Sequence, residues 1–160
     1  MSLFENSSYH WRETYFLFLK SENRPQEADV IQALLPLKGR LHITDSQDDQ
    51  DGCLESMTVL APADSAGIDV SYVTGEEIIE QRGELKKELT AVRLSDEDRA
   101  KLKLLLASDA RFDLFHFQQM GDDPEDDDIL DPGALLSVLS RLAKLCQGIA
   151  YDPQAGTFVP

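Results

Sequence analysis

Cysteine is scarce in this sequence, which has 160 residues and two cysteines, Cys53 and Cys146. The two lie far apart along the chain and form no Cys-x-x-Cys pair, which a thioredoxin-like redox centre or a zinc ribbon requires. Small secreted scaffolds are much richer in cysteine, because cross-links replace the core that they lack. The sequence therefore predicts two reduced thiols in a cytoplasmic protein, with a single disulfide as the alternative.

Long apolar runs are also missing. The stretch YFLFL (15–19) is five residues long, whereas a helix needs about 20 apolar residues to cross a bilayer. The first residues, MSLFENSSYHWRE, lack the basic and apolar segments of a secretory signal. We therefore expect a cytoplasmic protein with no membrane partner.

Basic residues are few. Thirty Asp and Glu residues stand against fifteen Lys and Arg residues, which gives a net charge of −15. Nucleic-acid phosphates and anionic lipid surfaces both attract cationic patches, so this balance argues against either as a partner. It is compatible with a basic protein partner. Because 42% of the residues are hydrophobic, the composition is that of a folded domain and not of a disordered chain.

Motifs for catalysis and nucleotide binding are not found. The sequence has no Gly-x-Ser-x-Gly nucleophile elbow, no Gly-x-Gly-x-x-Gly fingerprint and no Walker pattern. The three histidines, His10, His42 and His116, lack the HxH, HExxH or HxxxH spacing that is typical of zinc sites. We therefore expect no metal and no cofactor, and the missing motifs argue against an enzyme.

The acidic stretch DSQDDQDGCLES (45–56) resembles a calcium loop at first sight. When the loop is aligned on Gly52, Asp49 and Asp51 fall at ligand positions, but Thr58 falls where a bidentate glutamate is needed. The flanking segments alternate like strands, whereas a calcium loop of this kind lies between helices. We interpret the stretch as a hairpin tip in which Gly52 supplies a positive φ.

What the sequence does contain is a regular succession of strand and helix patterns. Period-2 or continuous apolar segments predict strands, and apolar stripes at helical spacing predict helices. Two further signals mark helix starts: Pro25 suits a first helical position, and Thr74 with Glu77 forms a T-x-x-E capping box. The predicted strands are 11–19, 39–44, 53–62, 67–73 and 111–117; the predicted helices are 23–39, 75–89, one opened by Ser95 and one from Asp131 to Gly148; a hairpin follows in 148–159.

This order predicts a single α+β domain over residues 1–160. We expect a ferredoxin-like (split βαβ) sandwich: a largely antiparallel sheet with helices mainly on one face, extended by a C-terminal αββ unit. A doubly wound α/β fold is the alternative, disfavoured because hairpin connections cannot join parallel strands. The segments 11–60 and 111–159 share an aromatic strand, a leucine-rich helix, a glycine and an Asp-x-Gln turn, which raises the hypothesis of an internal pseudo-repeat.

For function, the sequence favours a non-catalytic protein-binding or regulatory module. Its densest charge lies in the segment 122–131, which we interpret either as a solvated loop or as a contact surface for a basic partner, as in an inhibitor or immunity-type protein. A small enzyme built around His42 or His116 and nearby carboxylates is the alternative, and a homodimer through the sheet edge or face is a further expectation. The candidate partner-binding residues are Asp122, Asp123, Glu125, Asp126, Asp127 and Asp128.

Overall fold

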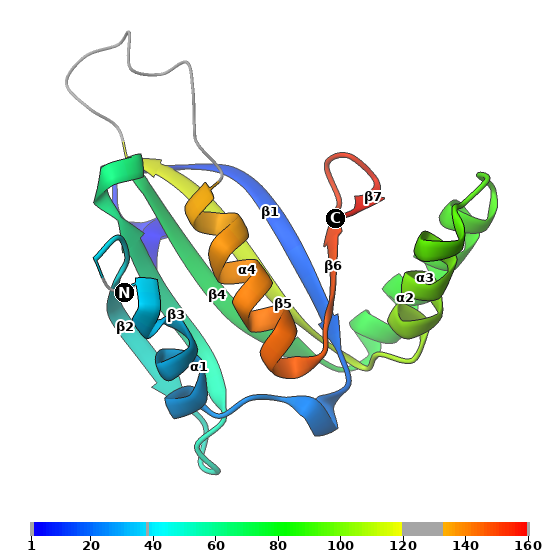
Figure 1. The fold of residues 1–160 in the computed structure, drawn as a ribbon, viewed down its shortest axis with the longest axis horizontal. Helices are drawn as coiled ribbons and strands as arrows, with labels where there is room; N and C mark the ends of the chain where they lie inside the picture. The colour runs from blue at the N-terminus through cyan, green and yellow to red at the C-terminus, as the bar shows by residue number, and fades with distance from the viewer. Residues whose placement is uncertain (1, 38, 120–132, 160) are drawn as a thin grey trace, which may run out of the picture.

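The computed structural model describes residues 2–37, 39–119 and 133–159, which form an α+β structure (Figure 1). A short 3₁₀ turn, η1 (Leu3–Glu5), precedes the first strand. The strands are β1 (Tyr9–Leu19), β2 (His42–Asp48), β3 (Leu54–Ala61), β4 (Ala66–Thr74), β5 (Ala110–Gln119), β6 (Ile149–Asp152) and β7 (Thr157–Phe158), and the α-helices are α1 (Glu27–Leu34), α2 (Glu76–Thr90), α3 (Asp96–Leu106) and α4 (Gly133–Cys146).

The strands form one sheet in the order β2-β3-β4-β5-β1-β6-β7, and each neighbouring pair is antiparallel. The predicted α+β class with an antiparallel sheet is thereby confirmed. Helix α4 connects β5 to β6, and β1 lies between those two strands. None of the described helices has the length and apolar composition that crossing a membrane requires.

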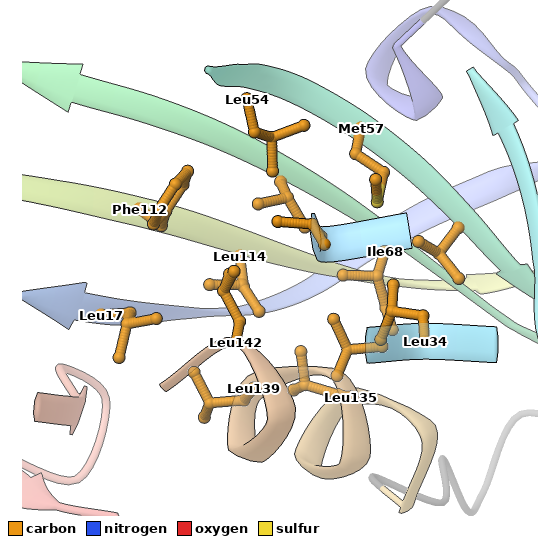
Figure 2. Packing of buried hydrophobic residues seen from close by; sticks show 14 of the residues in the cluster. Leu17, Leu34, Leu54, Met57, Ile68, Phe112, Leu114, Leu135, Leu139 and Leu142 are labelled. Carbon is orange, nitrogen blue, oxygen red and sulfur yellow. The ribbon is translucent and has the colours of Figure 1, made fainter. Parts of the chain in front are cut away.

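Helices α1 and α4 cover one face of the sheet and enclose the larger core (Figures 1 and 2). Leu17 and Leu114 point from β1 and β5 toward α4, where Leu135 and Leu139 meet them (Figure 2). The stripe predicted for α4 is confirmed, because Leu135, Leu139, Leu142 and Cys146 are all buried. Each fully buried leucine contributes about 1.5–3 kcal/mol of transfer free energy, so this stripe fixes α4 on the sheet.

A second core lies on the opposite face. Phe18 points away from its neighbours Leu17 and Leu19, since strand side chains alternate, and it packs with Ile78 of α2 and Leu105 of α3. The α2–α3 pair is therefore not on the face that α1 and α4 cover. The prediction of helices mainly on one face is wrong for this pair, because an apolar stripe does not say which sheet face will receive it.

Two of the predicted helix starts are also corrected. Thr74 is the last residue of β4, where it pairs with Ala110, and Gly75 precedes α2 without a side-chain cap. Pro25 does not open a helix: its carbonyl accepts the N–H of Leu54, so it continues the chain alongside β3. Helix α2 itself is confirmed and begins one residue after the predicted start, so strand pairing removes only the Thr74 cap there, whereas at Pro25 it replaces the predicted first helical turn. The N-cap at Ser95 is confirmed, since its hydroxyl accepts the N–H of Asp98.

Candidate functional site

The acidic residues predicted to bind a partner cannot be placed. They lie outside the described residues, so the structure does not test the prediction of a basic partner there. The residues concerned are Asp122, Asp123, Glu125, Asp126, Asp127 and Asp128.

The hairpin tip between β2 and β3 is organised by one carboxylate. Asp49 Oδ1 accepts the N–H groups of Asp51 and Cys53, and Asp49 Oδ2 forms an ion pair with Arg24 at 2.8 Å. These donors, the Cys53 N–H above all, lower the pKa of Asp49. Gly52 has φ +83°, as the hairpin interpretation requires. Within the described part of the chain, no group of three or more His, Cys, Asp or Glu side chains is arranged to hold a metal ion.

The histidines predicted as alternative catalytic residues have different environments. His42 is exposed on edge strand β2, opposite Leu60, and β3 and β4 separate it from the strand of His116. His116 is fully buried, and its Nδ1 lies 3.1 Å from Glu13 Oε1. The pairing of Glu13 with His116 across β1 and β5 creates this contact between residues 103 positions apart. Neither His42 nor His116 lines the grooves described below.

A second buried polar cluster lies on the opposite sheet face. The Arg111 guanidinium donates to both carboxylate oxygens of Asp113 and to Gln81 of α2, and it stacks 4.2 Å from the centre of the Phe16 ring. Burial raises the pKa of Asp113 more than the Arg111 hydrogen bonds lower it. Because Arg111 connects Asp113 of β5 with Gln81 of α2, we assign the cluster a structural role, which is to join α2 to the sheet.

The described part of the chain contains a well-formed groove between α4 and the β6–β7 hairpin, with a volume of about 630 Å³. Its lining is mostly apolar and includes several polar groups. The apolar lining includes Leu139, Ala143, Ile149, Ala150, Phe158 and Val159, and the polar lining includes Tyr15, Ser140, Lys144, Asp152 and Thr157.

A tight turn places the two walls of this groove. Helix α4 ends at Cys146, Gln147 adopts φ +54°, and the Gly148 N–H donates to Ala143 O at 3.0 Å. Gly148 is not the left-handed residue; its role is close approach, because a Cβ there would lie 2.7 Å from Leu17 Cδ1 and 3.0 Å from Phe18 O. The predicted helix end at Gly148 lies two residues after the observed last helical residue, Cys146.

The far end of the β6–β7 wall is held by one side chain. Strand β6 pairs with β1 over Phe16–Phe18. Beyond that point Gln154 replaces a backbone partner: its Oε1 accepts the Thr14 N–H at 2.9 Å, and its Nε2 donates to Thr14 O at 2.8 Å. Gln154 therefore positions the turn of the hairpin against β1.

The ionisable side chains that line the groove differ in whether they already have hydrogen-bond or ion-pair partners. Asp152 Oδ1 accepts the N–H groups of Gln154 and Ala155 and the Gln154 amide, so this oxygen serves the turn. Burial, with Glu13 and Asp152 nearby, raises the pKa of Tyr15, which keeps its hydroxyl protonated at neutral pH. Among the described residues, no carboxylate lies within ion-pair distance of the exposed Lys144.

The outer surface of α4 is a second feature that sequence reasoning missed. We call Leu136, Ser140, Arg141, Lys144 and Leu145 the α4 ridge. Leu136 and Leu145 are each 38% exposed, and Arg141 donates to Ala33 O of α1 at 3.1 Å. A second groove of about 640 Å³ separates the ridge from α1. The available signal was the lack of any Asp or Glu in residues 132–151 of a chain that has thirty.

In three comparisons with known proteins, no family model, no curated protein and no solved structure matched the chain. The function is therefore argued from the arrangement of the residues themselves.

Proposed function

We propose that this protein is a non-catalytic protein-binding module that engages its partner through the α4 ridge. The observation that carries the proposal is that the exposed half of one helix presents Arg141 and Lys144 between two exposed leucines, Leu136 and Leu145. Exposed apolar side chains beside arginine are typical of the centre of a protein interface. Among the described residues neither cation forms an ion pair with a carboxylate, so both remain available to a partner.

The charge of the ridge favours an acidic, amphipathic partner surface. The whole chain carries −15, but at physiological ionic strength charges are screened beyond about 8 Å. A docked segment therefore interacts mainly with Arg141 and Lys144. A two-fold homodimer through this ridge is disfavoured, because it would bring the same cations of both copies together. Self-association through the edge of the sheet and a basic partner for the segment 122–131 stay separate predictions.

The alternative of a small enzyme has one observation in its favour, the Glu13–His116 contact of 3.1 Å. A general base must reach the proton that it removes, yet His116 is fully buried. In the groove between α4 and the β6–β7 hairpin, the raised pKa of Tyr15 disfavours its phenolate form as a base. The environments of these groups support binding rather than proton transfer.

The connection of the ridge to the sheet also supports the finer fold assignment, and we infer a ferredoxin-like relationship. Helix α4 links β5 and β6, which flank β1. That is the arrangement of a split βαβ unit. In this interpretation the ridge is the outer surface of the crossover helix.

The proposed function is tested by quantitative capture from the lysate of the native cell. The wild-type chain, Leu145→Asp and Arg141→Gln are compared with two matched controls on the α2–α3 region, Leu104→Asp and Arg93→Gln. Both ridge variants should lose a partner that both controls retain, and that partner should also be released at high salt. Gln is shorter than Arg, so the second variant removes the charge together with the Arg141 donation to Ala33 O, and an unchanged circular dichroism spectrum should show that α4 remains folded. Equal capture by ridge and control variants would rule the ridge out.

A further inference from the structure

The groove between α4 and the β6–β7 hairpin combines an apolar interior with hydrogen-bond donors on its sides. We propose that it binds a small amphipathic anion, an apolar chain or ring that carries one carboxylate. Its volume of about 630 Å³ lies within the range of roughly 300–1,000 Å³ that small-molecule sites occupy. This site shares Ser140 and Lys144 with the α4 ridge, but Arg141 and Leu145, the ridge residues changed in the capture experiment, do not line it, so the two proposals are tested at different residues.

The interior suits the apolar part of such a ligand. Ala143 and Leu139 of α4 line the groove together with Ala150 of β6 and Val159, which follows β7. Two alanines leave space where larger side chains would meet, and Val159 is held in place by its N–H, which donates to Ala150 O at 3.0 Å. Backbone pairing and small side chains therefore contribute to the shape of the groove.

The α4 wall suits the carboxylate. Ser140 and Lys144 are four residues apart on α4, so they lie on the same helix face, and both line the groove. An ammonium and a hydroxyl on one face offer a carboxylate a charge-assisted hydrogen bond and a second donor. Lys144 has no competing carboxylate within ion-pair distance in the described part of the chain.

The carboxylates of Glu13 and Asp152 lie near the groove and would repel an anionic head group, so they restrict where that group can bind. Burial raises the pKa of Tyr15 most, and the carboxylates of Glu13 and Asp152 raise it further, so both negative charges act on that hydroxyl. Asp152 Oδ1 is already committed to three donors of the β6–β7 turn. The head group therefore lies at Ser140 and Lys144, away from Tyr15, and the apolar part covers Ala143 and Ala150.

The test uses three probes with the same chain and different heads: octanoate, octylamine and 1-octanol. Each is titrated into ¹⁵N-labelled protein while amide shifts are followed by NMR. Octanoate should bind more tightly than the alcohol and the amine, with the largest shifts at Gly148 and Ala150. Lys144→Met should weaken octanoate about tenfold, the size of one charge-assisted contact, and should leave 1-octanol unchanged. Lys86→Met, at an exposed lysine on α2, is the matched control and should change neither.

Ala143→Phe fills the groove and should abolish binding of octanoate and octanol alike, while Leu145→Asp on the ridge should leave both unchanged. If Ala143→Phe does not fold, the Lys144→Met comparison still decides the charge preference. The proposal is overturned if octylamine binds as tightly as octanoate, if Lys144→Met has no effect, or if the shifts map elsewhere. Loss of partner capture by the ridge variants would not alter any of these outcomes, so the two proposals succeed or fail separately.

Discussion

Gly148 is the position where a single methyl group should have the clearest effect on the fold. It lies between α4 and β6, and an added Cβ would meet Leu17 Cδ1 at 2.7 Å, Leu17 Cγ at 3.0 Å and Phe18 O at 3.0 Å. Leu17 is fully buried in the main core. The Gly148→Ala variant must therefore displace either a packed leucine or the backbone of the central strand β1.

The expected magnitude combines two opposing effects. Forcing an extra carbon into a packed core costs about 1–3 kcal/mol. Replacing glycine by alanine also restricts the unfolded chain, which recovers about 0.4–1 kcal/mol. Gly148 lacks a positive φ, so no backbone strain is added. We expect a net loss of about 1–2 kcal/mol in the free energy of unfolding, or a fall in Tm of about 2–8 °C for a domain of this size.

The assay is urea denaturation followed by circular dichroism, with a thermal melt on the same samples. Gly83→Ala is the matched control, because Gly83 lies inside α2 and a Cβ there would meet nothing within 4 Å. That variant should gain about 0.5–1 kcal/mol, since glycine is unfavourable inside a helix. The reasoning is refuted if Gly148→Ala is as stable as the wild type, or if both variants change stability in the same direction.

Three further predictions follow from individual contacts. Gln154→Ala removes two hydrogen bonds to the Thr14 backbone; hydrogen exchange of the Thr14 amide should accelerate at least tenfold, since each lost bond is worth about 0.5–1.5 kcal/mol, and unchanged protection would contradict the positioning role. The raised pKa of Asp113 means that the folded state holds this proton more tightly than the unfolded state. The Asp113 contribution to stability should therefore decrease as the pH rises from about 3.9 through the folded pKa, and denaturation curves should lose that slope in Asp113→Asn. Burial raises the pKa of Cys146 to about 11, so iodoacetamide should label the half-buried Cys53 first; mass spectrometry should find Cys146 labelled only in urea, and equal labelling without urea would refute its burial.

Local sequence patterns were sufficient to predict those features of the structure that depend only on a residue and its neighbours in the chain. The apolar stripe of α4 has the helical period, so its inward face follows from the chain alone. Gly52 takes a positive φ because the short β2–β3 connection demands it, and Ser95 caps α3 because its hydroxyl reaches a nearby N–H. The class of the fold and the order of its elements followed from such signals.

Tertiary structure decided everything that depends on strand partners and on the choice of sheet face. Asp69 looked like the solvent side of an alternating strand, yet it is buried, accepting hydrogen bonds from Thr58 and from Ser2 and Leu3 of the η1 segment. The Glu13–His116 contact and the α4–hairpin groove likewise join residues that are remote in sequence. The hydrophobic period of a segment shows which of its side chains share a face. Strand register and packing determine which residues of other segments lie opposite that face. For that reason the sequence predicted most elements of this protein, and only the folded chain showed which remote residues line the groove between α4 and the β6–β7 hairpin.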